Sequence, residues 1–508
     1  MALSNIQSIA LLGLDAIPVH VEVDIAKSDK QSLVIVGLPD AVVKESKDRV
    51  LTAIKNSGYQ TGNISCIVNL APGDLKKEGA LYDLPIAIGL LQSLGLLNEN
   101  KIYEDYLIVG ELSLSGETRP IHGALAIAML ARTLGKKGII LPSTNANEAA
   151  TVPDIDVIAI HNLNEAVNFF KNPHSIVPLT AKISSDLFKN ATPSVDFADV
   201  KGQLHVKRAL EIAAAGGHNV ILSGPPGSGK TMLAKALIGI VPEFTVEEAL
   251  ETTKIHSIAG ILPTGKSLVT ERPFRSPHHT ISYAGLIGGG TFPKPGEVSL
   301  AHNGILFLDE LPEFSRMALE VLRQPLEDRK VTISRAKGSF TFPTSFMCIA
   351  AMNPCPCGYL GHPDKRCSDS QIMIDRYQNK ISGPLRDRID MHIEVPALRY
   401  REMTQNSVGE SSLTVRNRVK TARSKQYKRF KGVKTNAQMS SSEIKEFIIL
   451  DSDSEEILRQ AVDVMGMSAR GCSRILRVAR TIADLNGDDH VNQEHLMEAI
   501  NYRMNTSR

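Results

Sequence analysis

The chain has 508 residues, which at about 150 residues per domain predicts roughly three domains. Hydrophobic residues make up 43% and charged residues 22% of the sequence, which excludes a wholly disordered, collagenous or fibrous protein. The net charge of +2, from 57 Lys and Arg against 55 Asp and Glu, excludes a histone-like polycation but leaves room for local basic patches.

The number of cysteines and the length of the apolar runs indicate the cellular compartment in which the protein is expected to work. Six cysteines are too few for a disulfide scaffold. The apolar run at 9–14 is too short for a signal peptide, has no Lys or Arg before it and ends at Asp15. No run approaches the ~20 apolar residues that span a bilayer. These features predict a cytoplasmic protein with no membrane partner.

Residues 1–185 alternate between strand and helix patterns. Apolar runs predict strands at 19–23, 33–36, 64–70, 106–109 and 138–142, and helical patterns lie at 41–57, 83–97 and 124–134. The segment 171–194 is rich in Pro and Ser and has no apolar period, so we interpret it as a linker. The sequence therefore predicts an N-terminal α/β domain.

The strongest motif follows an apolar strand at 219–223. It consists of Gly224, Pro225, Pro226, Gly227, Ser228, Gly229, Lys230 and Thr231, and a helical pattern follows it. This strand–loop–helix context is typical of a P-loop, whose backbone N–H groups surround phosphates at a helix N-terminus. Lys230 is expected to reach the β- and γ-phosphates, and Thr231 to bind Mg²⁺.

A second apolar strand, 304–308, ends in two carboxylates, Asp309 and Glu310. This is the pattern of a Walker B strand, in which Asp309 holds Mg²⁺ and Glu310 polarises the attacking water. An apolar strand with an acidic end is common by itself, but after a P-loop in the same chain it specifically indicates a Walker B strand. The long insert between the two motifs contains Arg-Pro-Phe-Arg-Ser-Pro-His-His at 272–279.

Two further polar residues fit the same chemistry less specifically. A continuous apolar strand at 345–352 ends in Asn353, whose amide could orient the lytic water, although such an Asn is more often a turn residue. Arg388 could reach the γ-phosphate of a neighbouring subunit, although a single arginine is more often part of a surface salt bridge.

Two basic features could contact DNA. Residues 329–343 alternate in polarity on both sides of a Gly-containing turn and predict a hairpin whose tip carries Arg335 and Lys337. Such a tip could follow a phosphate backbone, or it could be an ordinary surface hairpin. The basic segment 416–434 is interpreted as a solvated helix face.

Three of the six cysteines, Cys355, Cys357 and Cys367, lie close together in the sequence. Thiolates are favoured zinc ligands, but a fourth ligand would have to be His362, Asp369 or water. The alternative is a loop that the cysteines only help to shape. Cys66, Cys348 and Cys472 are expected in the core.

Beyond residue 398 the pattern is helical, with helices predicted at 440–450, 454–464, 468–485 and 492–503.

Taken together, the motifs resemble the YifB/ComM family of magnesium-chelatase-like AAA+ ATPases. The resemblance rests on the P-loop at 224–231, the segment Gly-Ile-Leu-Phe-Leu-Asp-Glu-Leu-Pro-Glu-Phe at 304–314, Asn-Pro-Cys-Pro-Cys-Gly at 353–358, Arg-Ile-Leu-Arg-Val-Ala-Arg-Thr-Ile-Ala-Asp-Leu at 474–485, and residues 34–50. It covers nearly the whole chain. It implies a multidomain α/β fold with a Lon-protease-like (S5 domain 2-like) domain at 1–185, an AAA+ P-loop core with a parallel sheet at 190–397 and a helical lid at 398–508.

The resemblance also implies an activity and residue roles. The expected activity is that of an ATP-driven, Mg²⁺-dependent hexameric DNA helicase, which promotes branch migration while incoming DNA is integrated during natural transformation. Single-stranded or branched DNA and recombination proteins are the implied partners. Asn353 becomes sensor 1, Arg388 the arginine finger and Arg470 the sensor 2 arginine; Arg386, where the family usually has Leu, is the alternative finger.

Two other classes of function compete with this one. A chelatase motor subunit, which helps to insert Mg²⁺ into a porphyrin, shares the ATPase core but lacks the Lon-like domain. A Lon-like protease needs a Ser/Lys dyad, and the resemblance places Tyr82 and Leu125 at the two dyad positions. We therefore expect the N-terminal domain to be inactive as a protease and to serve in assembly or face DNA.

Overall fold

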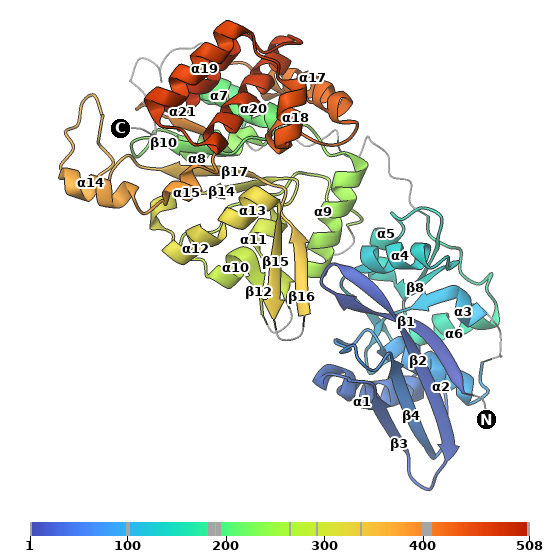
Figure 1. The fold of residues 1–508 in the computed structure, drawn as a ribbon. Helices are drawn as coiled ribbons and strands as arrows, with labels where there is room; N and C mark the ends of the chain where they lie inside the picture. Colours follow the sequence, from blue (N-terminus) through green and yellow to red (C-terminus); the bar gives the residue numbers. More distant parts are fainter. Residues whose placement is uncertain are drawn as a thin grey trace. The chain divides into compact units, whose positions relative to one another are not determined.

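The computed structural model describes residues 3–97, 102–180, 188, 195–263, 266–290, 293–335, 338–397 and 409–504. The chain forms two compact units (Figure 1). The first unit contains residues 1–187 and 245–270, and the second contains residues 188–244 and 271–508. No helix among the described residues has the length and apolar character needed to cross a membrane.

The first unit contains a four-stranded sheet in the order β1-β2-β4-β3. Its strands are β1 (Ser4–Leu12), β2 (Asp15–Lys27), β3 (Ser32–Val36) and β4 (Ile64–Ala71). Strand β2 pairs antiparallel with both β1 and β4, and β3 pairs parallel with β4. Alternate residues of β2 and β4 are buried, and helices α1 (Ala41–Asn56) and α2 (Asp83–Ser93) pack over this face. The predicted strands and helices of this region are confirmed, whereas β1 was not predicted.

A second, parallel sheet in the first unit has the order β5-β8-β9. The remaining elements of this unit are α3 (Ile102–Asp105), β5 (Tyr106–Ile108), β6 (Glu111–Leu112), β7 (Thr118–Arg119), α4 (Ala124–Thr133), β8 (Gly138–Pro142), α5 (Ser143–Ala149), β9 (Asp156–Ile160) and α6 (Leu163–Lys171). Strand β8 is buried along its whole length, as expected for a strand covered on both faces.

Helix α9 (Val246–Ala259) also belongs to the first unit, although it follows the P-loop in the chain. Its Ser257 hydroxyl donates to the buried carboxylate of Glu148 at 2.5 Å and accepts a hydrogen bond from the backbone of Gly123 at 2.9 Å. Lys254 forms an ion pair with Asp15 at 2.9 Å. Burial raises the pKa of Glu148, while the hydrogen bond from Ser257 opposes this shift.

The second unit is built on a parallel five-stranded sheet in the order β11-β14-β17-β10-β18. These strands are β10 (Val220–Ser223), β11 (Phe274–Arg275), β14 (Ile305–Leu308), β17 (Met347–Met352) and β18 (Met391–Glu394). The sheet confirms the α/β fold expected for this region. Its central strands are continuously apolar because both faces are covered.

Helices and short strands surround this sheet. They are α7 (Leu204–Gly216), α8 (Lys230–Leu237), α10 (Tyr283–Ile287), β12 (Gly288–Gly289), β13 (Lys294–Pro295), α11 (Glu297–Leu300), α12 (Arg316–Val321), α13 (Arg323–Asp328), α14 (Gln371–Gln378) and α15 (Gly383–Arg386). The predicted hairpin is confirmed as β15 (Lys330–Arg335) paired with β16 (Gly338–Pro343), and it projects from the body of this unit (Figure 1).

The C-terminal region is helical, as predicted. It contains α17 (Ser412–Phe430), α18 (Ser441–Phe447), α19 (Ser452–Met465), α20 (Ala469–Asn486) and α21 (Gln493–Met504). The Ser440 hydroxyl and the Glu443 carboxylate form a capping box at the start of α18. Val419, Ile475 and Val478 share one hydrophobic core with Leu210 of α7 and Leu233 of α8, so these C-terminal helices pack directly on the five-stranded sheet and its helices.

The basic helix α17 differs from the sequence interpretation. Arg416 donates to the carbonyl of Gly239 at 2.7 Å, and buried Arg423 donates to the carbonyl of Ala214 at 2.8 Å. Arg418 bonds Glu211 at 2.6 Å. The interpretation as a solvated face is therefore wrong for these arginines, because each reaches acceptors on neighbouring elements that the local sequence does not reveal.

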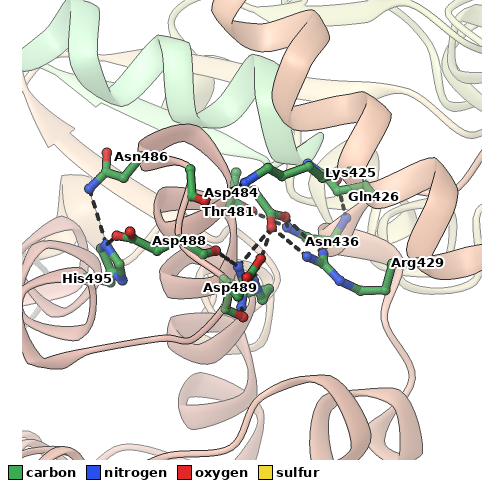
Figure 2. Close-up of polar contacts among 12 residues, drawn as sticks. Lys425, Gln426, Arg429, Asn436, Thr481, Asp484, Asn486, Asp488, Asp489 and His495 are labelled. Carbon is green, nitrogen blue, oxygen red and sulfur yellow. Dashed lines mark hydrogen bonds and ion pairs between the residues drawn. The ribbon is translucent and has the colours of Figure 1, made fainter.

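A buried carboxylate holds the lid together. Asp484 of α20 has a side chain with no exposure and accepts hydrogen bonds from Arg429 of α17 at 2.5 and 2.9 Å (Figure 2). It also accepts from Asn436 at 2.8 Å and from Arg480 at 3.0 Å. Three segments of the lid therefore meet at one charge, and a buried pair of this kind is costly to break because the remaining charges lose their partner.

We expect Asp484→Asn to lower the stability of the second unit by about 3–5 kcal/mol, because Arg429 and Arg480 would lose their buried counter-charge. The measurement is urea unfolding of the full chain combined with hydrogen exchange of the α20 amides. Asp463→Asn is the matched control, since Asp463 and its partner Arg459 both have side chains that are 65% exposed. Equal stability of the two variants would contradict this account of the lid.

Candidate functional site

The P-loop runs from the end of β10 into α8. Gly227 and Gly229 have φ angles of 76° and 85°, in the left-handed region that favours glycine. A Cβ at Gly224 would lie 2.1 Å from the carbonyl oxygen of Val395, so this position also requires glycine. Lys230 is buried, and its Nζ donates to the carbonyls of Gly224 at 2.7 Å and Pro225 at 2.9 Å. Burial lowers the pKa of Lys230, and Asp309 opposes this shift.

The Walker B carboxylate meets the P-loop hydroxyl. Thr231 Oγ1 donates to Asp309 Oδ2 at 3.0 Å, and Asp309 Oδ1 accepts from the backbone N–H of Glu310 at 2.9 Å. Glu310 has a φ of 52°, a left-handed conformation that is unusual for a glutamate and often found at functional sites. A hydroxyl and carboxylate oxygens are the ligands that Mg²⁺ prefers. The residues present therefore fit a nucleotide with its Mg²⁺.

Asn353 lies at the end of β17, between the other two motifs. Its Oδ1 accepts a hydrogen bond from Lys230 Nζ at 3.3 Å. The structure thus brings together Lys230, Thr231, Asp309 and Asn353, which the sequence had selected separately.

His279 is a site residue that the sequence analysis did not assign. Its Nδ1 lies 3.2 Å from Glu310 Oε2, and its ring lies 4.1 Å from that of His278. The residue follows β11, which pairs with β14, so sheet order places it beside the carboxylate at the end of β14. The only sequence signal was a pair of histidines in the segment 272–279, after a strand of two residues that is too short to recognise.

The two predicted phosphate-binding arginines lie together. Arg388 is 9% exposed, donates to the carbonyl of Pro384 at 2.8 Å and pairs with Glu327 of α13. Arg470, in the first turn of α20, has a side chain that is 65% exposed and lies 3.4 Å from the same Glu327 carboxylate. Both arginines are therefore held by a carboxylate that the sequence analysis did not select.

The alternative finger, Arg386, has different surroundings. It donates to the carbonyl of Gln378 and lines a cavity of about 740 Å³. The P-loop residues Gly224 and Pro225 and the imidazole of His392 line the same cavity. Burial, followed by the neighbouring Arg503 and Arg386, lowers the pKa of His392 to about 3.

The candidate DNA-contacting residues are described only in part. Arg335 ends β15, where its backbone pairs with Gly338 across the hairpin. Lys337 lies outside the described residues.

Three cysteines and one aspartate form a candidate metal centre. The Sγ atoms of Cys355, Cys357 and Cys367 lie 3.4, 3.5 and 3.7 Å from one another. Asp369 Oδ2 lies 3.9 Å from Cys367 Sγ and accepts from the Cys357 backbone at 2.8 Å. A tetrahedral zinc site with Zn–S bonds of about 2.3 Å has sulfurs about 3.8 Å apart, so the geometry fits zinc.

Asp369 is a better fourth ligand than His362. All four ligand atoms of Cys355, Cys357, Cys367 and Asp369 lie within 4.8 Å of one another. The Nδ1 atom of His362 instead accepts hydrogen bonds from the backbones of Asp364 and Lys365, both at 3.0 Å.

The two positions compared with the Lon dyad lie in the core of the first unit. Tyr82 precedes α2 and Leu125 lies in α4, and both are fully buried. Burial raises the pKa of Tyr82. Neither side chain supplies a serine nucleophile or a lysine base.

We expect about one zinc per purified chain, bound by the three thiolates and Asp369. Asp369→Ala should lower zinc retention during dialysis against a chelator, and Cys472→Ser should not, because Cys472 lies on α20 outside the cluster. Elemental analysis and the thiolate-to-cobalt absorption of Co²⁺-exchanged protein are the two measurements. Purified protein that contains no metal and yields no such absorption would contradict the assignment.

Three family models together match most of the chain. Residues 196–403 match the family described as magnesium chelatase, subunit ChlI. Residues 21–145 match the family described as subunit ChlI of Mg-chelatase, and residues 409–503 match its C-terminal family. A shorter likeness, 32% identity over 30% of this chain and 29% of the relative, links part of it to Lon protease 2 of Bacillus subtilis.

Full-length relatives give the same result. The chain is 43% identical to the uncharacterized protein YifB of Escherichia coli, over 99% of this chain and 97% of the relative. It is also 43% identical to the competence protein ComM of Haemophilus influenzae, over 99% of this chain and 98% of the relative. With the P-loop, the Walker B carboxylates and the lid in place, the chain belongs to the YifB/ComM family of magnesium-chelatase-like AAA+ proteins.

Proposed function

We propose that this protein is an ATP-driven hexameric DNA translocase that promotes branch migration while incoming DNA is integrated during natural transformation. The observation that carries the proposal is that Lys230 bonds Asn353 and Thr231 bonds Asp309 at neighbouring strand ends of one sheet. The full-length likeness to a competence protein supports the link to DNA uptake.

The P-loop would hold the nucleotide. Backbone N–H groups of 224–231 and the start of α8 would bind the phosphates, and Lys230 would exchange its two carbonyl partners for phosphate oxygens. Thr231 and Asp309 would hold Mg²⁺, which neutralises charge on the phosphates when bound.

Hydrolysis would depend on Glu310. This carboxylate would polarise the attacking water, Asn353 would orient it, and His279 would set the direction of the Glu310 side chain through their 3.2 Å contact. Arg388 would reach the phosphate of a neighbouring subunit, which makes a ring necessary for full activity.

The hairpin β15–β16 would contact DNA. It projects from the second unit (Figure 1), and the sequence carries the basic residues Arg335, the last residue of β15, and Lys337 shortly after it. Repeated around a ring, such tips would follow a phosphate backbone. The first unit would not act as a protease. It would serve in assembly of the ring or lie on the side that faces DNA.

A chelatase motor is the second candidate, because the matching families carry the chelatase description. It predicts ATPase activity that responds to a chelatase partner subunit and a porphyrin but not to DNA. Measuring ATP turnover with single-stranded, duplex and branched DNA separates the two functions. The protease alternative is disfavoured by Tyr82 and Leu125, and casein cleavage would revive it.

Glu310→Gln should retain ATP binding but slow turnover by about 100-fold or more, because the water loses its base. Lys230→Ala should weaken ATP binding itself, because the phosphate charge loses its partner. Nucleotide binding and steady-state ATPase assays distinguish the two effects, with exposed Lys235→Ala on the same helix as the control. If Glu310→Gln turns over ATP at the wild-type rate, the Walker B assignment is wrong.

The double variant Arg335→Ala with Lys337→Ala should leave DNA-free ATPase near wild type and abolish DNA stimulation and strand displacement. The loss of two phosphate contacts should flatten the slope of log affinity against log salt by up to about 2 units. Lys428→Ala with Lys431→Ala, at exposed positions near the end of α17, is the control for loss of any two positive charges. Undiminished strand displacement by the hairpin variant would place the DNA track elsewhere.

A further inference from the structure

One carboxylate holds both arginines that the proposed function assigns to phosphate. Glu327 lies on α13, and its two oxygens are divided between Arg388 and Arg470. Arg388 lies in the chain after α15, whereas Arg470 begins α20 in the lid. Glu327 therefore links the ATPase sheet region to the lid through the two side chains expected to sense the nucleotide.

This contact competes with phosphate binding. Carboxylate and phosphate oxygens take the same guanidinium N–H groups, and both do so with charge-assisted hydrogen bonds. Arg388 also donates to Pro384 at 2.8 Å and is 9% exposed, so its charge is withdrawn from the surface while Glu327 holds it. Its buried Nε has no hydrogen-bond partner among the described residues, so the present arrangement leaves this guanidinium incompletely satisfied.

Helix α13 connects Glu327 to the hairpin. Arg329 ends the helix, where its N–H donates to the carbonyl of Pro325 at 3.1 Å, and β15 begins at the next residue. The carbonyl of Arg329 accepts from Thr344 at 2.8 Å, which closes the base of the hairpin. The first residue of the hairpin therefore lies three residues after Glu327 in the chain, so a displacement of the hairpin would act close to Glu327.

We propose that Glu327 is a positioning residue that keeps Arg388 and Arg470 from phosphate until DNA engages the hairpin, so that DNA contact releases both arginines for ATP turnover. The proposal rests on the proposed function, since it uses the DNA-contacting hairpin and the phosphate-binding role of the two arginines.

The test is Glu327→Gln in the full-length protein, which removes the charge and keeps the shape. We expect the DNA-free kcat for ATP to rise about fivefold, which corresponds to about 1 kcal/mol, with an unchanged KM. The rate at saturating DNA should match wild type, so the DNA stimulation ratio should fall by the same factor. A merely structural role would lower activity and would not raise it.

Glu320→Gln is the matched control. Glu320 pairs with Arg323 at 2.7 Å, and its side chain is 33% exposed against 37% for Glu327. Within the described part of the chain, no hydrogen bond or ion pair joins Glu320 to Arg388 or Arg470. This variant should keep the wild-type stimulation ratio. In a background with both Arg388→Ala and Arg470→Ala, Glu327→Gln should no longer raise the DNA-free rate, because both arginines that it would release are absent.

The outcomes separate this proposal from the proposed function. An unchanged or lower DNA-free kcat in Glu327→Gln, with a melting temperature like that of wild type, would overturn the role of Glu327. A rise that persists when both Arg388 and Arg470 are absent would also overturn it. Wild-type protein whose ATPase does not respond to DNA would instead refute the proposed function.

Mixing Arg388→Ala with Lys230→Ala protein tests the role of Arg388 separately. Rings that contain both variants should recover some activity if Arg388 acts on the nucleotide of a neighbouring subunit.

Discussion

The site depends on the parallel register of β10, β14 and β17. Leu308 pairs with Ala350 and Ser223 pairs with Met352, so all three strands end at the same edge of the sheet. A slip of one residue in β14 would move Asp309 by about 3.3 Å and turn its side chain toward the other face. The 3.0 Å hydrogen bond from Thr231 would then be lost. Close packing of these apolar strands therefore sets the geometry on which the candidate chemistry rests.

The cationic side chains around the P-loop are arranged to bind an anion that the protein itself does not supply. Lys230 is buried against two neutral carbonyls, and Arg388 and Arg470 share a single carboxylate. Phosphate oxygens would be stronger partners for Lys230 than its two carbonyls, and they would compete with Glu327 for the two arginines. The lid is different, because Asp484 is surrounded by donors that satisfy it fully. The polar contacts of Asp484 therefore stabilise the lid in one arrangement. The partners of Lys230, Arg388 and Arg470 could instead be replaced by phosphate oxygens.

The chain order links the nucleotide site to the first unit. Only residues 238–245 separate the P-loop helix α8 from α9, and α9 packs in the first unit through Ser257 and Glu148. The chain passes between the two units near 187, 244 and 270. The first unit is therefore connected to the ATPase sheet by the segments on both sides of α9 as well as by the segment near 187.

Local sequence determined much of this protein. The glycines of the P-loop, the apolar strands that end at Asp309 and Asn353, the hairpin and the lid helices were predictable because each depends on backbone conformation or on a short apolar period. Tertiary structure alone decided that α9 joins the first unit, that His279 meets Glu310, and that Asp369 completes the cysteine cluster. It also decided that Arg423 turns inward and that Glu327 holds Arg388 and Arg470. These contacts join residues from different elements, and they depend on sheet order and helix rotation, which are set by the packing of the whole core and not by any short stretch of sequence.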